Sequence, residues 1–257
     1  AKNWRDKQRE YRERRSYYYD KYDNEGKAKE KKEEPRKQYG FIAVSVGEGL
    51  SEIFKGIGAD YIIEGGQTMN PSTEDMLEAI EKVHAETVYI LPNNKNIIMA
   101  ANQAAELVED KKIVVIPSKS VPQCISAMVE FNDKKSAEAN EKAMNKAIVR
   151  VTSGQLTYAV RDTEIDGIEI KKDDILGMVE GKIVTVGKDI DDVLNRVVSQ
   201  MVDEDTEFLN VYYGKEIKKP QADVMLRALE TKYADDEIEV SFKKGGQPLY
   251  YYIISAE

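Results

Sequence analysis

From residue 40 onward, the chain alternates between short continuous apolar runs and stretches with apolar residues at helical spacing. Residues 41–46 form the first apolar run, and after a turn at 47–49 the apolar positions Leu50, Ile53, Phe54 and Ile57 share one helix face. The pattern predicts three more such units, with strands at 61–63, 87–91 and 113–116, helices at 72–84, 96–108 and 122–131, and a closing helix at 136–147. Continuous apolar strands alternating with helices are typical of a parallel sheet covered on both faces.

After residue 148 the pattern becomes richer in strands, and hairpins are expected. It predicts strands at 147–153, 156–161, 167–170, 182–186, 208–213, 237–242 and 249–254, and helices at 189–202 and 220–233. We therefore expect an α/β protein in which a parallel-sheet domain at 40–148 is followed by a smaller mixed α+β domain at 149–257.

Residues 1–39 differ in composition from the rest. They hold more lysine and arginine than aspartate and glutamate, several tyrosines and almost no aliphatic residues. Such a segment buries too little apolar surface to offset ordering, so we expect a charged linker or a solvated helix. Binding of RNA or an acidic partner is the alternative, although the interspersed acids weaken it. The chain opens with Ala1 rather than Met, which suggests a fragment of a longer protein.

The net charge of −9 over 257 residues argues against nucleic acid as a partner, because a phosphate backbone needs a basic face. Cys124 is the single cysteine and cannot form an internal disulfide, which fits a cytoplasmic location. No apolar run approaches the length of about 20 residues that spans a bilayer, and no signal peptide is visible.

The stretch EGGQTMNPSTED at 64–75 is a loop between a strand and a helix. Gly65 and Gly66 are expected to adopt positive φ angles, and Ser72 with the acid three residues later fits a capping box, so a helix should begin at 70–72. The loop would then expose backbone N–H groups and the side chains of Gln67, Thr68, Asn70 and Ser72. It suits a ligand or a partner, although a plain capped connection would look the same.

Parallel strands end at one edge of a sheet, so the loops at 46–50, 64–72, 92–96 and 117–123 should share one crevice. Besides the loop residues just named, the candidate binding residues there are Asn93, Asn94, Lys95, Asn96, Ser118, Lys119 and Gln123. Amides, hydroxyls and two cations suit a polar or anionic ligand, or a polar partner. Alternatively, the asparagines and serines cap helices and the lysines are solvated.

These loops contain no histidine and no close carboxylate pair apart from Glu48 and Glu64, so no catalytic residue is predicted. The turn at 47–49 resembles half of a dinucleotide fingerprint but lacks its third glycine. His84 is the only histidine and cannot form a zinc site alone, so no metal site is expected. With no histidine near it in the sequence, Cys124 fits a small buried residue better than a reactive thiolate.

The segment at 243–248 joins the last two predicted strands and precedes three tyrosines. Gly246 and Gln247 could face the crevice from the second domain. The alternative is a simple hairpin loop with half-exposed tyrosines, which the patterning favours slightly.

Four motifs, EGGQTMNPSTED, LPNNKNIIMAANQAA, VIPSKSVPQCISAM and GGQPLYYYIIS, resemble the C-terminal region of FakA, the bacterial fatty acid kinase protein of the dihydroxyacetone-kinase-like (DAK phosphatase) family. The resemblance covers about residues 39–257, and more distantly it extends to DegV-type lipid-binding proteins. One departure is Cys124, where the family pattern has glycine.

The resemblance implies a kinase that phosphorylates a fatty acid held by a separate DegV-like carrier, giving an acyl phosphate. It implies that ATP and magnesium bind in an N-terminal domain that has no counterpart in this chain, so no cofactor is expected here. The first hypothesis is that this chain docks the DegV-like carrier or forms a homodimer, alongside the rest of its own kinase. The second is a small-ligand or phosphotransfer domain in which Lys95, Lys119 and the Asn93–Asn94 loop bind a phosphate, a carboxylate or a lipid.

Overall fold

The computed structural model describes residues 34–66 and 69–257. The predicted linker at 1–39 lies almost wholly outside this range, and its interpretation stays a prediction. Residues Lys37–Glu257 group together as one unit. None of the described helices combines the length and apolar character that crossing a bilayer requires.

The first sheet is parallel throughout, as the continuous apolar runs predict. Its strands are β1 (Lys37–Ser45), β2 (Tyr61–Glu64), β3 (Ala85–Leu91) and β4 (Lys112–Val115), in the order β2-β1-β3-β4. The order places β1 and β3 side by side although β2 lies between them in sequence. The strand order therefore reverses between β1 and β3: the chain adds β2 on one side of β1, and β3 and β4 on the other. The loops that follow β1 and β3 diverge at the carboxyl ends of these strands.

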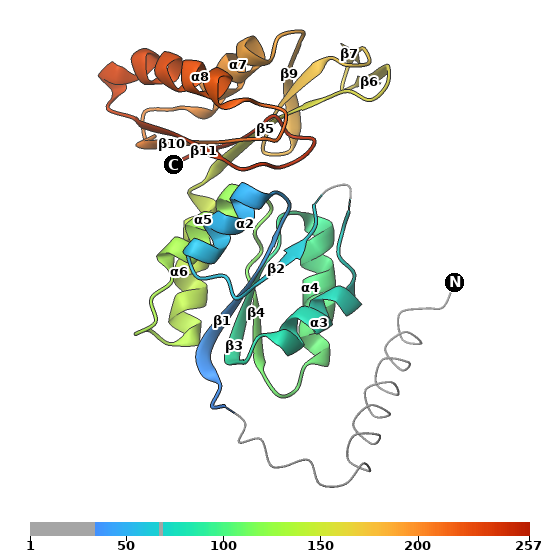
Figure 1. The fold of residues 1–257 in the computed structure, drawn as a ribbon, viewed down its shortest axis with the longest axis vertical. Coiled ribbons are helices and arrows are strands. Elements are labelled where there is room, and N and C mark those ends of the chain that lie inside the picture. The colour runs from blue at the N-terminus through green and yellow to red at the C-terminus, as the bar shows by residue number, and fades with distance from the viewer. Residues whose placement is uncertain (1–33, 67–68) are drawn as a thin grey trace. The chain divides into compact units, whose positions relative to one another are not determined.

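Five helices cover the two faces of this sheet (Figure 1). They are α2 (Glu48–Gly56), α3 (Thr73–Lys82), α4 (Lys95–Leu107), α5 (Val121–Glu130) and α6 (Ala137–Val149). Figure 1 shows α3 and α4 on one face and α2, α5 and α6 on the other. The central strand β1 is consequently shielded on both sides, and Ile42, Ala43 and Val44 have no exposed surface.

The second sheet has six strands in the order β11-β10-β12-β5-β8-β9. These are β5 (Thr152–Tyr158), β8 (Ile175–Val179), β9 (Lys182–Gly187), β10 (Phe208–Tyr213), β11 (Glu239–Lys244) and β12 (Tyr252–Ala256). Only β10 and β11 run parallel; the other neighbours are antiparallel. A separate hairpin joins β6 (Thr163–Ile165) to β7 (Ile168–Ile170). The predicted α/β fold with a mixed second part is confirmed.

Several details of the strand prediction were wrong. Residues 147–149 belong to α6, because Ala147 and Ile148 continue the buried face that Asn140 and Met144 begin at helical spacing. A single strand, β5, replaces the predicted strands at 147–153 and 156–161, and β6 and β8 were not predicted. Gly154 lies inside β5 and Gly177 inside β8. The predicted domain boundary at 148 falls in the last turn of α6 and stays a prediction.

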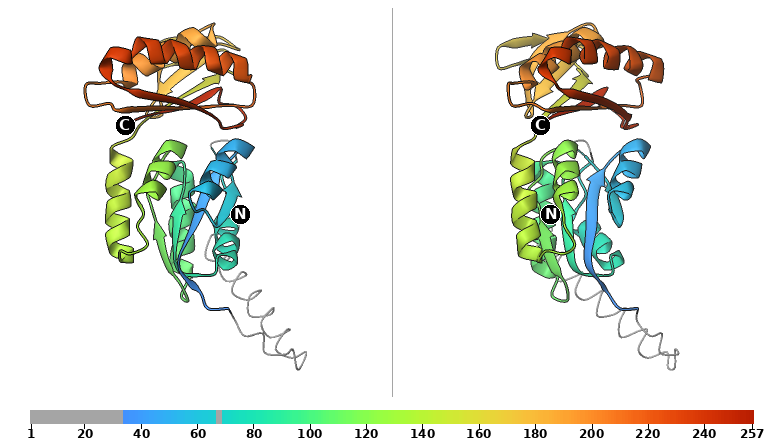
Figure 2. Two further views of the ribbon diagram at one scale, coloured as in Figure 1. Left: turned by 60° about the vertical axis from the view of Figure 1, so that its left-hand side comes forward. Right: turned by 90° about the vertical axis from the view of Figure 1, so that its left-hand side faces the viewer.

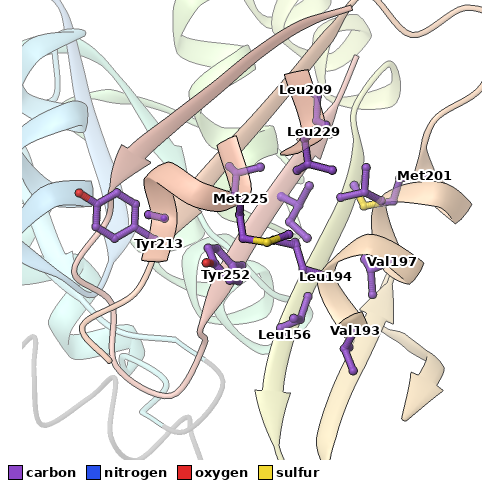
Figure 3. Packing of buried hydrophobic residues seen from close by; sticks show 14 of the residues in the cluster. Leu156, Val193, Leu194, Val197, Met201, Leu209, Tyr213, Met225, Leu229 and Tyr252 are labelled. Atoms are coloured by element: carbon purple, nitrogen blue, oxygen red, sulfur yellow. The ribbon is translucent and has the colours of Figure 1, made fainter. Parts of the chain in front are cut away.

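Helices α7 (Ile190–Met201) and α8 (Lys219–Lys232) cover one face of the six-stranded sheet, followed by a short 3-10 turn, η1 (Ala234–Asp236) (Figure 2). Figure 3 shows Val193, Leu194 and Val197 of α7 beside Leu156 of β5. Gly154 and Gly177 allow α7 to lie close to the sheet, because neither has a side chain on the face that α7 covers. A Cβ added to Gly177 would lie 2.4 Å from a Val197 methyl group, and one added to Gly154 would lie 2.4 Å from the Met201 sulfur.

The opposite face of the six-stranded sheet packs against the first sheet and its helices. Tyr212 of β10 and Ile253 of β12 are buried in the same apolar cluster as Leu50 and Phe54 of α2. The hydroxyls of Ser120, before α5, and Ser153, in β5, lie 2.6 Å apart. Ser126 of α5 also bonds the Glu257 carboxylate. The loops that follow β1 and β4 are therefore covered by the second sheet.

Candidate functional site

The candidate site lies at the carboxyl edge of the parallel sheet, where the loops after β1, β2, β3 and β4 meet. The reversal of strand order between β1 and β3 marks the position at which open α/β sheets usually bind ligands. The structure divides the predicted residues there into a buried group, whose polar atoms hold the loops together, and an exposed rim.

The loop after β2 begins α3 as predicted. Ser72 is the N-cap: its hydroxyl accepts from the Asp75 N–H (3.1 Å), and the Asp75 carboxylate accepts from the Ser72 N–H (2.8 Å). The prediction of positive φ at Gly65 and Gly66 was wrong, since neither glycine has one. Gly65 is instead required by space, because an added Cβ would lie 2.6 Å from the Pro71 ring. Gln67 and Thr68 lie outside the described residues.

The Asn93–Asn94 pair after β3 ties three loops together. The Asn93 amide donates to the carbonyls of Val44 (3.0 Å) and Gly65 (3.2 Å). Asn94 caps α4, because its side-chain oxygen accepts from the N–H groups of the second and third residues after it. Its amide nitrogen donates to Asn70 (3.1 Å). Both asparagine amides are therefore engaged within the protein.

The loop after β4 is also held by internal bonds. Ser118 is fully buried, and its hydroxyl donates to the Pro92 carbonyl (2.6 Å). Gln123 donates to the Ile148 carbonyl (3.0 Å) and accepts from the Lys119 N–H (2.8 Å). Cys124 is completely buried beside Ser118, and burial raises the pKa of its thiol to about 12. The thiol is therefore neutral near pH 7, as expected of a buried cysteine.

The Gly245–Gln247 segment reaches this site from the second sheet. It is not the loop of a hairpin, as the patterning had slightly favoured, because β11 and β12 lie on opposite sides of β10. The Gly245 carbonyl accepts from the Leu50 N–H (2.9 Å), and Gln247 is only 3% exposed, with its amide donating to the Tyr212 carbonyl (2.9 Å). Gly246 has a φ of 68°, a conformation that favours glycine.

The backbone of the Gly47–Gly49 turn packs directly against the backbone of this segment, and this contact accounts for the glycines without a dinucleotide site. A Cβ added at Gly49 would lie 1.9 Å from the Lys244 carbonyl oxygen, and one at Gly47 would lie 2.7 Å from the Gln247 nitrogen. Gly47 also has a φ of 118°. Both glycines let two backbones approach closely, which explains a glycine pair that the sequence alone left unassigned.

The exposed rim consists of the remaining predicted residues. Asn70, Ser72, Lys95, Asn96 and Lys119 are all exposed. They present two cations, two amides and a hydroxyl to solvent. Within the described ranges, histidine, cysteine, aspartate and glutamate do not gather in a group of three or more that could hold a metal ion. The rim therefore offers polar recognition groups to solvent.

The sequence reasoning missed Gly154 and Gly177, which bring α7 onto the second sheet. A usable signal existed, because glycine inside an apolar strand often marks a close approach of another element. Ser120 and Ser153 were also missed as a link between the two sheets. Their contact joins residues 33 positions apart, and no local pattern announces it.

The family of FakA-like C-terminal regions, named for the C-terminal part of a fatty acid kinase protein, matches residues 40–257. Protein YloV of Bacillus subtilis is 49% identical over 234 residues, which are 91% of this chain and 42% of that protein. The chain thus spans less than half the length of the curated relatives it matches.

Several solved structures share the fold at low sequence identity. A DegV family protein from Corynebacterium glutamicum has a TM-score of 0.59 at 13% identity, covering 85% of this chain and 96% of that one. The fatty acid kinase B3 protein of Streptococcus pneumoniae, loaded with linoleic acid, has a TM-score of 0.56 at 10% identity, with 86% and 99% covered. The dihydroxyacetone kinase of C. freundii has a TM-score of 0.56 at 13% identity, with 87% and 49% covered.

Proposed function

Since the chain belongs to the family of FakA-like C-terminal regions of fatty acid kinases, we propose that it docks a DegV-like protein carrying a fatty acid. In this proposal the chain presents the carrier to the rest of the kinase, which phosphorylates the acid to an acyl phosphate. ATP and magnesium bind in that other part. The chain is not catalytic alone, and a second copy of it is a further candidate partner.

The observation that carries the proposal is the closed interface between the six-stranded sheet and α7. An acyl chain needs an elongated apolar cavity. Here Met201 and Val197 fill the space above Gly154 and Gly177 so tightly that a single added methyl group would overlap them. The chain therefore shares its fold with fatty-acid-loaded proteins, while this part of its interior is occupied by its own side chains.

The exposed rim supports docking more than small-anion binding. The amides of Asn93, Asn94 and Gln123 bond the protein's own backbone and side chains, so they are poorly placed to bind a phosphate or carboxylate. Lys95 and Lys119 remain exposed at the rim. Exposed cations beside polar groups are typical of the rim of a protein interface, where they guide association.

The test is a binding measurement between this chain and the S. pneumoniae fatty acid kinase B3 protein loaded with linoleic acid. Lys95→Glu with Lys119→Glu should weaken binding at least about tenfold at low salt, because the charge of the rim is inverted. Lys142→Glu, combined with Lys146→Glu, makes the same total charge change on the exposed side of α6 and serves as the matched control.

Equal affinities for the rim double variant and the α6 double variant would contradict docking at this rim. Sedimentation of the free chain tests self-association: a concentration-dependent dimer that the rim variant abolishes would instead assign the rim to a second copy. Loss of folding is checked by circular dichroism, and none of these lysines is buried, so both variants should fold.

A further inference from the structure

Strand β2 is one of the two edges of the parallel sheet, and no described strand pairs with its outer side. An edge strand leaves half of its backbone N–H and C=O groups without a ladder partner. Proteins commonly protect such edges with lysine, proline or a covering element.

The other edges of the two larger sheets carry lysine, and β2 does not. Lys112 lies in the edge strand β4, Lys182 in the edge strand β9, and Lys243 and Lys244 in the edge strand β11. The four residues of β2 are Tyr, Ile, Ile and Glu. A lysine within an edge strand disfavours pairing with a further strand, and β2 lacks one. Lys82 of α3 lies 5.3 Å from the Tyr61 ring centroid, so a cation shields the Tyr61 end of this edge and leaves the part nearer Glu64 open.

A hollow of about 360 Å³ runs beside this edge. Among the described residues, all of β2 lines it, together with Met69, Asn70, Pro71, Asp75 and Glu78. Met69 follows the strand and is 55% exposed, so its side chain is accessible from solvent. The hollow therefore combines unpaired backbone groups with an accessible apolar contact, which is what an added strand requires.

The negative charge that lines the hollow favours a positively charged occupant. Glu64 at the end of β2 and Asp75 and Glu78 on α3 are exposed and line it. Asp75 and Glu78 are three residues apart and so share one face of the helix. A second copy of the chain pairing edge to edge would bring two sets of these carboxylates together, which is unfavourable. A lysine- or arginine-bearing segment would be attracted instead.

We propose that the β2 edge binds an extended, lysine- or arginine-containing segment of another polypeptide as an added strand, with its cations facing Glu64, Asp75 and Glu78. The bound segment extends the sheet beyond β2, and its apolar side chains contact Met69. The hollow shares Asn70 with the rim proposed for carrier docking, but Lys95 and Lys119 do not line it, so different variants test the two proposals and either can fail alone.

The experiment titrates the 257-residue chain with fluorescent hexapeptides and follows anisotropy. The probe alternates lysine and valine; the controls are a glutamate–valine peptide and a lysine–valine peptide N-methylated at every valine, which cannot form a full ladder. The lysine–valine probe should bind at least about tenfold more tightly than either control. Absence of binding by this probe, or equal binding of the N-methylated peptide, overturns the proposal.

Substitutions test whether the lysine–valine probe binds at the hollow beside β2. Glu64→Lys with Glu78→Lys should weaken binding of the lysine–valine probe at least about tenfold. Glu106→Lys with Glu109→Lys makes an equal charge change at the end of α4 and just after it, outside the hollow, and should leave binding unchanged. All four positions are exposed, so these variants should fold. If this control weakens binding as much as the variant in the hollow, the attraction is general and the proposed site is wrong.

Discussion

The N–H of Leu50 donates a 2.9 Å hydrogen bond to the carbonyl of Gly245, which joins the first helix of the parallel sheet to the end of β11 in the second sheet. This bond lies between two glycine-containing turns whose backbones are too close to accept any side chain at Gly49. The contact fills the β1 side of the position where an α/β sheet would otherwise open toward a ligand. The two sheets are thus fastened at the predicted binding edge.

Gly49→Ala should disrupt this contact. Its new Cβ would lie 1.9 Å from the Lys244 carbonyl oxygen, so the free energy of unfolding should fall by about 2 kcal/mol or more. Gly56→Ala, at the end of the same helix, has nothing within 4 Å of its new Cβ and is the matched control, expected to be neutral or slightly stabilising. Urea unfolding measures both. Equal stabilities for the two variants would contradict the close backbone contact.

Ser72→Ala should remove the N-cap of α3. The hydroxyl accepts from the Asp75 N–H, and its loss should cost about 1 kcal/mol of unfolding free energy. Ser72→Asn supplies another capping side chain and should recover most of this loss. Thermal unfolding gives the ranking, and an Asn variant as unstable as the Ala variant would show that capping is not the role of Ser72.

Gly177→Ala should overpack the interface between β8 and α7. The added methyl group would lie 2.4 Å from Val197, so a loss of about 1–3 kcal/mol is expected. Val197→Ala in the same chain makes room for it, so the double variant should be more stable than the sum of the single losses predicts. Strict additivity in urea unfolding would mean that the two positions do not touch.

Alkaline pH should destabilise the fold. Burial raises the pKa of Cys124 from 9.0 to about 12, and burial, with a smaller contribution from the Glu257 charge, raises that of Tyr212 from 10.0 to about 12. A group whose pKa is higher in the folded than in the unfolded state stabilises fully below its unfolded pKa. That contribution is lost as the pH rises from about 9 toward 12.

Absorbance at 295 nm and circular dichroism, recorded together, test this prediction. The buried tyrosines should ionise only as the circular dichroism signal is lost. The thiol should resist alkylation at pH 8 until denaturant is added, because it is both buried and protonated. Native circular dichroism persisting while every tyrosine titrates near pH 10 is the contrary result.

Much of the fold is visible in the sequence because its signals are local. The run of apolar residues in β1 and the Ser72–Asp75 box each act within a few residues, so the parallel sheet and the start of α3 were predicted correctly. The interior glycines of β5 and β8 went unassigned, because the side chains that require glycine there belong to α7, which follows later in the chain. Local patterns do not report such contacts.

The sequence predicted which loops meet at the candidate site, but not how their side chains are bonded there. The loops do meet at one edge, yet Asn94 and Gln123 were candidate binding groups, and the structure shows their amides engaged inside the protein. The sequence could not reveal that Gln247 would be buried against the same edge, because this depends on the packing of the two sheets. Lys95 and Lys119 were correctly identified as exposed cations in one interpretation, and their binding role stays a prediction.

The most direct test of the docking proposal is a calorimetric titration of this chain with the linoleic-acid-loaded fatty acid kinase B3 protein of S. pneumoniae, with free linoleic acid titrated in parallel. Docking predicts saturable binding of the loaded carrier and no binding of the free acid, because the proposal assigns the lipid to the carrier. Saturable binding of the free acid without binding of the carrier would contradict the account and assign a lipid cavity to this chain.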